Sequence, residues 1–156
     1  MDKPHITLIG MGLIGSSIGH ALKRGELASH ITGYARSATT REKALSIGFV
    51  DSIADSLQQA VVDADIVFLN VPVGMIADIV KDMAASLKSG AIVTDVGSVK
   101  SQSWMPCKRI CQKIRLSYLR IRLPEQNFQA PKPVLQNYLI IVGASLHLMQ
   151  KPINKL

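Results

Sequence analysis

The sequence predicts an α/β protein in which parallel strands are joined by crossover helices, and three observations support this. Apolar runs alternate with helical patterns over residues 1–104, which is typical of repeated βαβ units. The first run leads into segment 10–15, Gly-Met-Gly-Leu-Ile-Gly, a spacing found between the first strand and helix of Rossmann-type folds. The alternation of apolar runs and helical patterns does not continue through residues 105–156. We therefore expect a Rossmann-type, doubly wound parallel sheet, truncated after about five strands and followed by a C-terminal tail.

The first half of residues 1–104 should form three strands and two helices. Glycines at two positions favour helix ends, and a threonine favours a helix start. The expected elements are a strand at His5–Ile9, a helix at Leu13–Lys23 closed by Gly25, a strand at His30–Tyr34, a helix capped by Thr40 and ended by Gly48, and a brief strand at Phe49–Asp51.

The second half continues the alternation. A strongly apolar run stops at a proline, as a buried parallel strand does at its end. The expected elements are a short helix at Ser56–Val62, a strand at Asp65–Val71, a helix from about Met75 to Leu87, a strand at Ala91–Asp95 after a turn at Gly90, and a helix from Val99.

Composition divides the chain into two regions. Residues 1–104 carry nine Lys/Arg and ten Asp/Glu, whereas residues 105–156 carry nine Lys/Arg and a single acidic residue, Glu125. The tail also holds five of the seven prolines and one of the eleven glycines. We predict a nucleotide-binding domain over 1–104 and a basic tail of no defined fold over 105–156. The tail contains no recognisable nucleic-acid motif, so neither nucleic acid nor a membrane is an expected partner.

Targeting and metal signals are weak. The amino terminus passes directly into a strand without a signal-peptide pattern, and the apolar stretches are too interrupted to span a bilayer, so we expect a cytoplasmic protein. Cys107 and Cys111 form a lone C-x3-C pair, which is too sparse for a metal site or a disulfide framework. The four histidines form no cluster in the sequence, and we assign no metal ligand.

The glycine-spaced segment predicts a dinucleotide site. Gly10 permits a tight turn, Gly12 lets the backbone approach a diphosphate, and Gly15 lets the helix pack closely. The helix that begins at Leu13 and Ile14 offers unpaired N–H groups and a partial positive charge to phosphate. These five residues are the predicted cofactor-binding loop.

The residues after the second strand indicate which cofactor binds. An NAD site usually has Asp or Glu there, whereas this chain has Ala35, Arg36 and Ser37. A guanidinium and hydroxyl groups suit a 2′-phosphate, so NADP is favoured and NAD stays open. Arg41 lies a few residues further along the chain, and if Arg36 and Arg41 are only solvated surface charges, this preference loses its basis. Residues 70–74, Asn-Val-Pro-Val-Gly, lie at the carboxyl end of another strand, where ligands bind in open sheets. Val71 and Pro72 from this segment complete the predicted cofactor set.

These segments resemble the N-terminal domain of the prephenate/arogenate (cyclohexadienyl) dehydrogenases over about residues 5–103. The resemblance rests on residues 9–17, on Gly33-Tyr34, on residues 71–73 and above all on residues 95–100, Asp-Val-Gly-Ser-Val-Lys. It implies a homodimeric enzyme of tyrosine biosynthesis that oxidatively decarboxylates prephenate or arogenate with a nicotinamide cofactor. It also implies a catalytic role for Ser98, which orients the substrate hydroxyl and a histidine, although a helix cap alone would explain this serine.

The family's histidine motif and helical C-terminal domain have no counterpart in residues 105–156. A shifted reading frame restores the motif. In this frame each new codon consists of the third base of one codon and the first two bases of the next. The possible codons of Arg120–Lys132 then permit the translation His-Pro-Val-Ala-Gly-Thr-Glu-Phe-Ser-Gly-Pro-Lys. The same shift permits Phe-Ile-Ile-Pro-Ala directly before that histidine. We therefore expect a frameshift near residues 103–105, and a truncated, inactive chain without the family homodimer. The alternative is a non-catalytic NAD(P)-binding module whose basic tail binds an acidic partner or a membrane surface.

Overall fold

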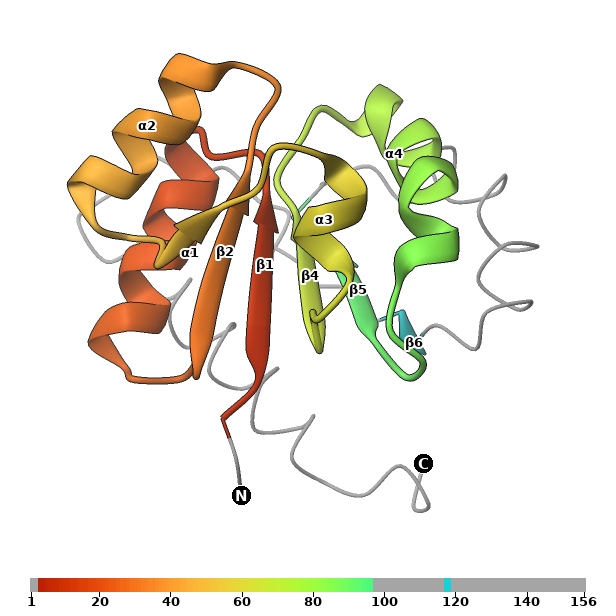
Figure 1. Ribbon diagram of the computed structural model, residues 1–156, viewed down its shortest axis with the longest axis horizontal. Coiled ribbons are helices and arrows are strands. Elements are labelled where there is room, and N and C mark those ends of the chain that lie inside the picture. Colours follow the sequence, from red (N-terminus) through yellow and green to blue (C-terminus); the bar gives the residue numbers. More distant parts are fainter. Residues whose placement is uncertain (1–2, 97–116, 119–156) are drawn as a thin grey trace, which may run out of the picture.

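The computed structural model describes residues 3–96 and 117–118, and these form one parallel sheet with helices on both faces (Figure 1). The strands lie in the order β3-β2-β1-β4-β5-β6, and every pair of neighbours is parallel. Their bounds are β1 His5–Ile9, β2 His30–Tyr34, β3 Ser52–Ile53, β4 Ile66–Leu69, β5 Ile92–Asp95 and β6 Ser117–Tyr118.

The helices divide between the two faces of the sheet. One face carries α1 (Leu13–Arg24) and α2 (Ala38–Ile47), and the other carries α3 (Leu57–Val61) and α4 (Ile76–Met83). Two short 3₁₀ turns flank α4, η1 (Val73–Met75) before it and η2 (Ala84–Ser86) after it. No helix among the described residues is long and apolar enough to cross a membrane.

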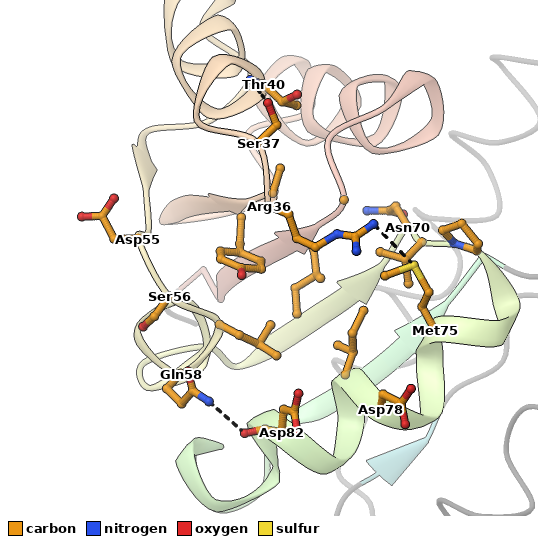
Figure 2. A pocket seen from close by; sticks show the side chains of 18 residues that line it. Arg36, Ser37, Thr40, Asp55, Ser56, Gln58, Asn70, Met75, Asp78 and Asp82 are labelled. Atoms are coloured by element: carbon orange, nitrogen blue, oxygen red, sulfur yellow. Dashed lines mark hydrogen bonds between the residues drawn. The ribbon is translucent and has the colours of Figure 1, made fainter.

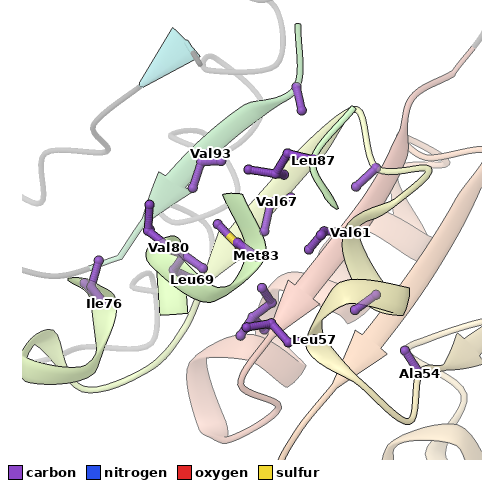
Figure 3. Close-up of a cluster of buried hydrophobic side chains, with 14 residues drawn as sticks. Ala54, Leu57, Val61, Val67, Leu69, Ile76, Val80, Met83, Leu87 and Val93 are labelled. Atoms are coloured by element: carbon purple, nitrogen blue, oxygen red, sulfur yellow. The ribbon is translucent and has the colours of Figure 1, made fainter. Parts of the chain in front are cut away.

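Alternation along β1 distributes its side chains to two hydrophobic clusters. Ile6 and Leu8 pack under α1 and α2, whereas Ile9 belongs to the cluster beneath α3 and α4 (Figure 3). Thr7 faces the latter side and is fully buried, and its hydroxyl donates to the carbonyl of Ala60 in α3 at 2.6 Å. This bond satisfies the buried Thr7 hydroxyl. Because side chains of β1 pack into both clusters, the strand is buried on both faces, as is usual in a parallel sheet.

The amino-terminal ends of the strands carry a polar network on the edge of the sheet opposite the glycine loop. His5 and His30 contact edge to face with ring centroids 5.0 Å apart. Their Nε2 atoms lie 2.9 Å from the Thr32 hydroxyl and 2.8 Å from the Ser52 hydroxyl, respectively. Burial, followed by the neighbouring His30, lowers the pKa of His5. Side-chain hydrogen bonds between adjacent strands therefore hold this edge together.

Two aspartates close the same edge with backbone bonds. Asp65 accepts from the backbone N–H of His5 at 2.9 Å, and Asp51 accepts from that of Ile31 at 2.8 Å. Burial raises the pKa of both carboxyls, but these bonds and the ammonium groups of Lys88 and Lys23 outweigh it, so each pKa lies below its ordinary value.

Most predicted elements are present, with three corrections. The strand predicted at Phe49–Asp51 is wrong, because Phe49 and Val50 are buried in the core and pairing with β2 is made by Ser52–Ile53. The cap of α2 is Ser37 rather than Thr40, whose backbone N–H donates to the Ser37 hydroxyl.

The third correction concerns the edge of the sheet beyond β5. The sequence predicted that β5 would be the last strand and that the tail would contribute none. Instead, Ser117–Tyr118 lies parallel to β5, in register with Ile92 and Val93. The predicted helix from Val99 and the domain boundary at residue 104 lie outside the described residues.

Candidate functional site

A cavity of about 740 Å³ opens at the carboxyl ends of the central strands (Figure 2). The chain reverses its direction of progress through the sheet between β1 and β4, because it runs outward from β1 through β2 and β3 and then crosses back to β4. Open α/β sheets bind ligands in the crevice at such a switch point. The cavity is lined from the ends of β1 and β2, from the segment that follows β4, from the start of α2, and from the loops and helices around α3 and α4.

The glycine loop between β1 and α1 is a tight turn whose shape requires glycine at two places. Gly10 has φ +89°, and a Cβ there would fall 2.4 Å from the backbone oxygen of Asn70. A Cβ on Gly15 would fall 2.1 Å from the backbone oxygen of Gly10. The turn and the first turn of α1 are therefore in backbone contact, which matches the roles predicted for Gly10 and, in part, for Gly15.

Gly12 differs from these two glycines because its side faces open space. A Cβ there would have no heavy atom within 4 Å. Gly12 is the N-cap of α1, no side chain from residues 3–96 caps this helix end, and the first turn contains no acidic residue. An uncapped helix end beside an open backbone offers N–H groups and positive potential to an anion. The loop thus fits the diphosphate of a dinucleotide.

The turn after β2 presents Arg36 to the cavity. The guanidinium reaches across to the sulfur of Met75, 3.9 Å away, and within residues 3–96 it forms no ion pair (Figure 2). Ser37 lies next to it and caps α2. Arg41 does not share this role, because its guanidinium donates to the backbone oxygens of Ala35 at 2.8 Å and Arg36 at 3.3 Å. One arginine therefore faces the cavity while the other shapes the turn.

The opposite rim of the cavity was not predicted from the sequence. It carries carboxylates and an amide on the loop before α3, on α3 and on α4, and the amide of Gln58 donates to the backbone oxygen of Asp82 at 3.2 Å. Only the tertiary fold brings α3 beside α4, so no local pattern indicates this rim. Its lining residues include Asp55, Ser56, Gln58, Asp78 and Asp82.

The predicted site residues fall into three groups. Five line the cavity: Gly10, Arg36, Ser37, Val71 and Pro72. Four others, Gly12, Leu13, Ile14 and Gly15, form the remainder of the loop and the start of α1, with the Leu13 side chain 86% exposed. Ser98, the predicted catalytic residue, lies outside the described residues.

Comparison with known proteins agrees with this architecture. A family profile described as "Prephenate dehydrogenase, nucleotide-binding domain" matches residues 18–117. The cyclohexadienyl dehydrogenase of Zymomonas mobilis is 40% identical over 96 residues, which cover 62% of this chain and 33% of that protein. The prephenate dehydrogenase of Bacillus subtilis is 35% identical over 101 residues, covering 64% and 27% of the two chains. This chain therefore spans about a third of the length of the curated relatives it matches.

Solved structures show the same fold. The prephenate dehydrogenase of A. aeolicus in complex with hydroxyphenyl propionate and NAD+ superposes with a TM-score of 0.67 at 26% identity, over 77% of this chain and 41% of that one. The Synechocystis arogenate dehydrogenase gives a TM-score of 0.63 at 33% identity, over 68% and 37%. With the profile matching well over half of its length, this chain belongs to the prephenate dehydrogenase family and contains the family's nucleotide-binding domain.

Proposed function

We propose that the domain binds a nicotinamide dinucleotide at the β1–β4 switch point and prefers NADP to NAD. The observation that carries the preference is Arg36, which faces the cavity at the end of β2 without an ion-pair partner among residues 3–96. The Ser37 hydroxyl and the positive end of the ten-residue helix α2 adjoin it, and both favour a phosphate group.

The distribution of charge around the cavity supports the same preference. Arg36 comes from the β2–α2 turn, and its guanidinium reaches to 3.9 Å from the Met75 sulfur. Asp78 and Asp82 lie on α4, and the third lining carboxylate, Asp55, lies 3.8 Å from the Arg41 guanidinium. A 2′-phosphate would therefore be attracted to Arg36 and repelled from the carboxylates on α4. No carboxylate follows β2 at the position where one would accept from the ribose hydroxyls of NAD.

Substitution of Arg36 tests the preference. In Arg36→Ala, the dissociation constant for NADP+ should rise by about 10- to 100-fold, which is the range for a charge-assisted hydrogen bond. That for NAD+ should change less than about twofold, because NAD+ lacks the phosphate. Equal weakening of both cofactors, or no change in either, would contradict the preference.

We further propose that the parent enzyme oxidatively decarboxylates prephenate or arogenate, with Ser98 orienting the substrate hydroxyl, and that this chain lacks turnover. Sequence similarity to prephenate and cyclohexadienyl dehydrogenases supports the reaction class. The shifted reading of residues 105–132 supports the loss. The shifted Phe-Ile-Ile would span residues 115–118, the same stretch in which Ser117–Tyr118 pairs with β5. A one-base shift would therefore leave the spacing between the two strands intact while replacing the strand's residues and the histidine after it.

Two measurements test this proposal. The gene across codons 95–140 should contain a second frame that continues through the histidine motif into a helical domain. Purified full chain should show no prephenate- or arogenate-dependent reduction of NADP+ or NAD+, because a positioned acid/base alone contributes about 10²–10⁴-fold. Measurable turnover, or a gene in which no such frame exists, would sink the proposal.

The basic tail favours a second candidate function. Residues 105–156 carry nine Lys/Arg and one acidic residue, and such a segment is attracted to acidic surfaces. In this alternative the chain is a dinucleotide-binding module that docks through its tail. Deletion of residues 105–156 would then abolish capture of an acidic partner or of anionic vesicles, whereas under the frameshift account it changes neither.

A further inference from the structure

Asn70 carries a buried side-chain amide that has no hydrogen-bond partner within residues 3–96. Neither Nδ2 nor Oδ1 bonds any of these residues, and both atoms are inaccessible to solvent. Buried polar side-chain atoms are nearly always bonded, and leaving one unsatisfied is costly. The backbone N–H of Asn70 donates to the carbonyl of Ile9 at 2.7 Å, so the residue is anchored at the end of β4 and its side chain is presented at a fixed place.

The place is the contact between β4 and the glycine loop. Asn70 lines the cavity described above (Figure 2). Its Nδ2 lies 3.3 Å from the point where a Cβ on Gly15 would stand. Its backbone oxygen lies 2.4 Å from the point where a Cβ on Gly10 would stand. A side chain at position 15 would therefore crowd this amide, and one at position 10 would clash with the Asn70 backbone. The next residues along the chain, Val71 and Pro72, offer no side-chain polar group.

We propose that Asn70 hydrogen-bonds the sugar–diphosphate portion of the bound dinucleotide and orients it at the switch point. An amide supplies one donor group and one acceptor, and phosphate oxygens and ribose hydroxyls together accept and donate. The proposal rests on the dinucleotide-binding function proposed above. Asn70 would then supply a side-chain hydrogen bond to the ligand at a loop whose glycines supply only backbone groups.

Asn70→Leu is the sharpest test, because leucine keeps the branched shape and replaces both polar atoms by methyl groups. Apolar replacement of an unsatisfied group of the same shape is neutral or stabilising. The thermal midpoint of the ligand-free full chain should therefore stay level or rise, while the dissociation constant for NADP+ rises about tenfold or more. Asn70→Ala gives a second substitution if leucine fails to fold. Ser46→Ala, an exposed hydroxyl on α2 bonded to the Lys43 carbonyl, is the control and should change neither value.

Fragments locate the contact. If the substitution Asn70→Leu weakens ADP and NADP+ by the same factor, the amide contacts the portion that ADP contains, including the diphosphate. If it weakens NADP+ but not ADP, the amide contacts the ribose on the nicotinamide side. Both outcomes support the proposal. Equal binding of NADP+ by wild type and Asn70→Leu overturns it, as does a lowered thermal midpoint with unchanged binding, which would make Asn70 a structural residue. If wild type itself binds neither NADP+ nor NAD+, the dinucleotide function fails together with this inference.

Discussion

The backbone oxygen of Gly10 occupies the space that a side chain at position 15 would need. The two residues are the first and last glycines of the loop, and a Cβ on Gly15 would stand 2.1 Å from that oxygen. A backbone atom cannot rotate away as a side chain can. The loop therefore holds its shape only because both positions are glycine, and its conformation is tied to that of the first turn of α1.

Gly15→Ala should destabilise the domain, because the loop or α1 must shift to admit the methyl group. We expect a loss of about 1–3 kcal/mol in the free energy of unfolding, the usual range for overpacking, measured by urea denaturation. Gly74→Ala is the matched control, since a Cβ there meets nothing within 4 Å and φ is not positive, and it should change stability by less than about 0.5 kcal/mol. Equal effects of the two substitutions would contradict this account.

Gly12→Ala should show the opposite balance, weakening the cofactor more than the fold. The added methyl group meets no protein atom within 4 Å, so the stability cost should be about 1 kcal/mol or less, the cost of alanine at an N-cap. The methyl group would nevertheless stand where the backbone approaches a diphosphate. We expect the dissociation constant for NADP+ to rise at least tenfold by calorimetry; unchanged affinity would show that the ligand does not approach this face.

Arg41→Ala should lower stability and weaken both cofactors by the same factor. The side chain is 16% exposed, donates to the carbonyls of Ala35 and Arg36, and lies 3.8 Å from the Asp55 carboxylate. Its removal therefore loosens the turn rather than deleting a phosphate contact. A loss of about 1–3 kcal/mol is expected for hydrogen bonds from a charged donor. Arg24→Ala removes the same charge from an exposed site on α1 and serves as the control. A selective loss of NADP+ binding would instead place Arg41 at the phosphate.

Stability should fall on acidification in two separate steps. The folded-state pKa of His5 lies below its ordinary value of 6.5 because of burial and His30, so the unfolded chain binds more protons and stability declines as the pH drops below about 6.5. The pKa values of Asp51 and Asp65 are lowered from 3.8, so their contribution is present above that pH and is lost below it. Thermal midpoints measured from pH 8 to 3 should show both steps.

His5→Asn should remove the first step and leave the second. The asparagine does not titrate, so the slope of the midpoint against pH between 7 and 5 should flatten. A slope that stays as steep as in the wild type would assign the first step to other groups.

The central strands could be predicted from the sequence because their patterns are local. The observed bounds of β1 and β2 are those predicted, and Gly48 ends α2 in the left-handed conformation as expected. The predicted strand at Phe49–Asp51 failed for a tertiary reason. Gly19 lets Phe49 approach α1, where a Cβ would lie 2.6 Å from the Phe49 ring, and this burial moves the pairing residues to Ser52–Ile53.

The candidate site was predictable where it follows strand ends and not where it follows helices. Arg36, Ser37, Val71 and Pro72 come directly after β2 and β4, so the rule for parallel sheets locates them. Asn70 lies in a segment that the same rule selects, but only the tertiary structure shows that its amide has no partner among the described residues. The α3–α4 rim depends on the packing of two helices, which no local pattern encodes.

We propose that this chain forms a dinucleotide site with a preference for a 2′-phosphate. Calorimetric titration of the purified full chain with NADP+ and with NAD+, at one ionic strength, distinguishes this site from its alternatives. We expect saturable binding of one dinucleotide per chain, with a dissociation constant at least tenfold lower for NADP+. Tighter binding of NAD+ would contradict the assignment of Arg36, and binding of neither would contradict the site itself.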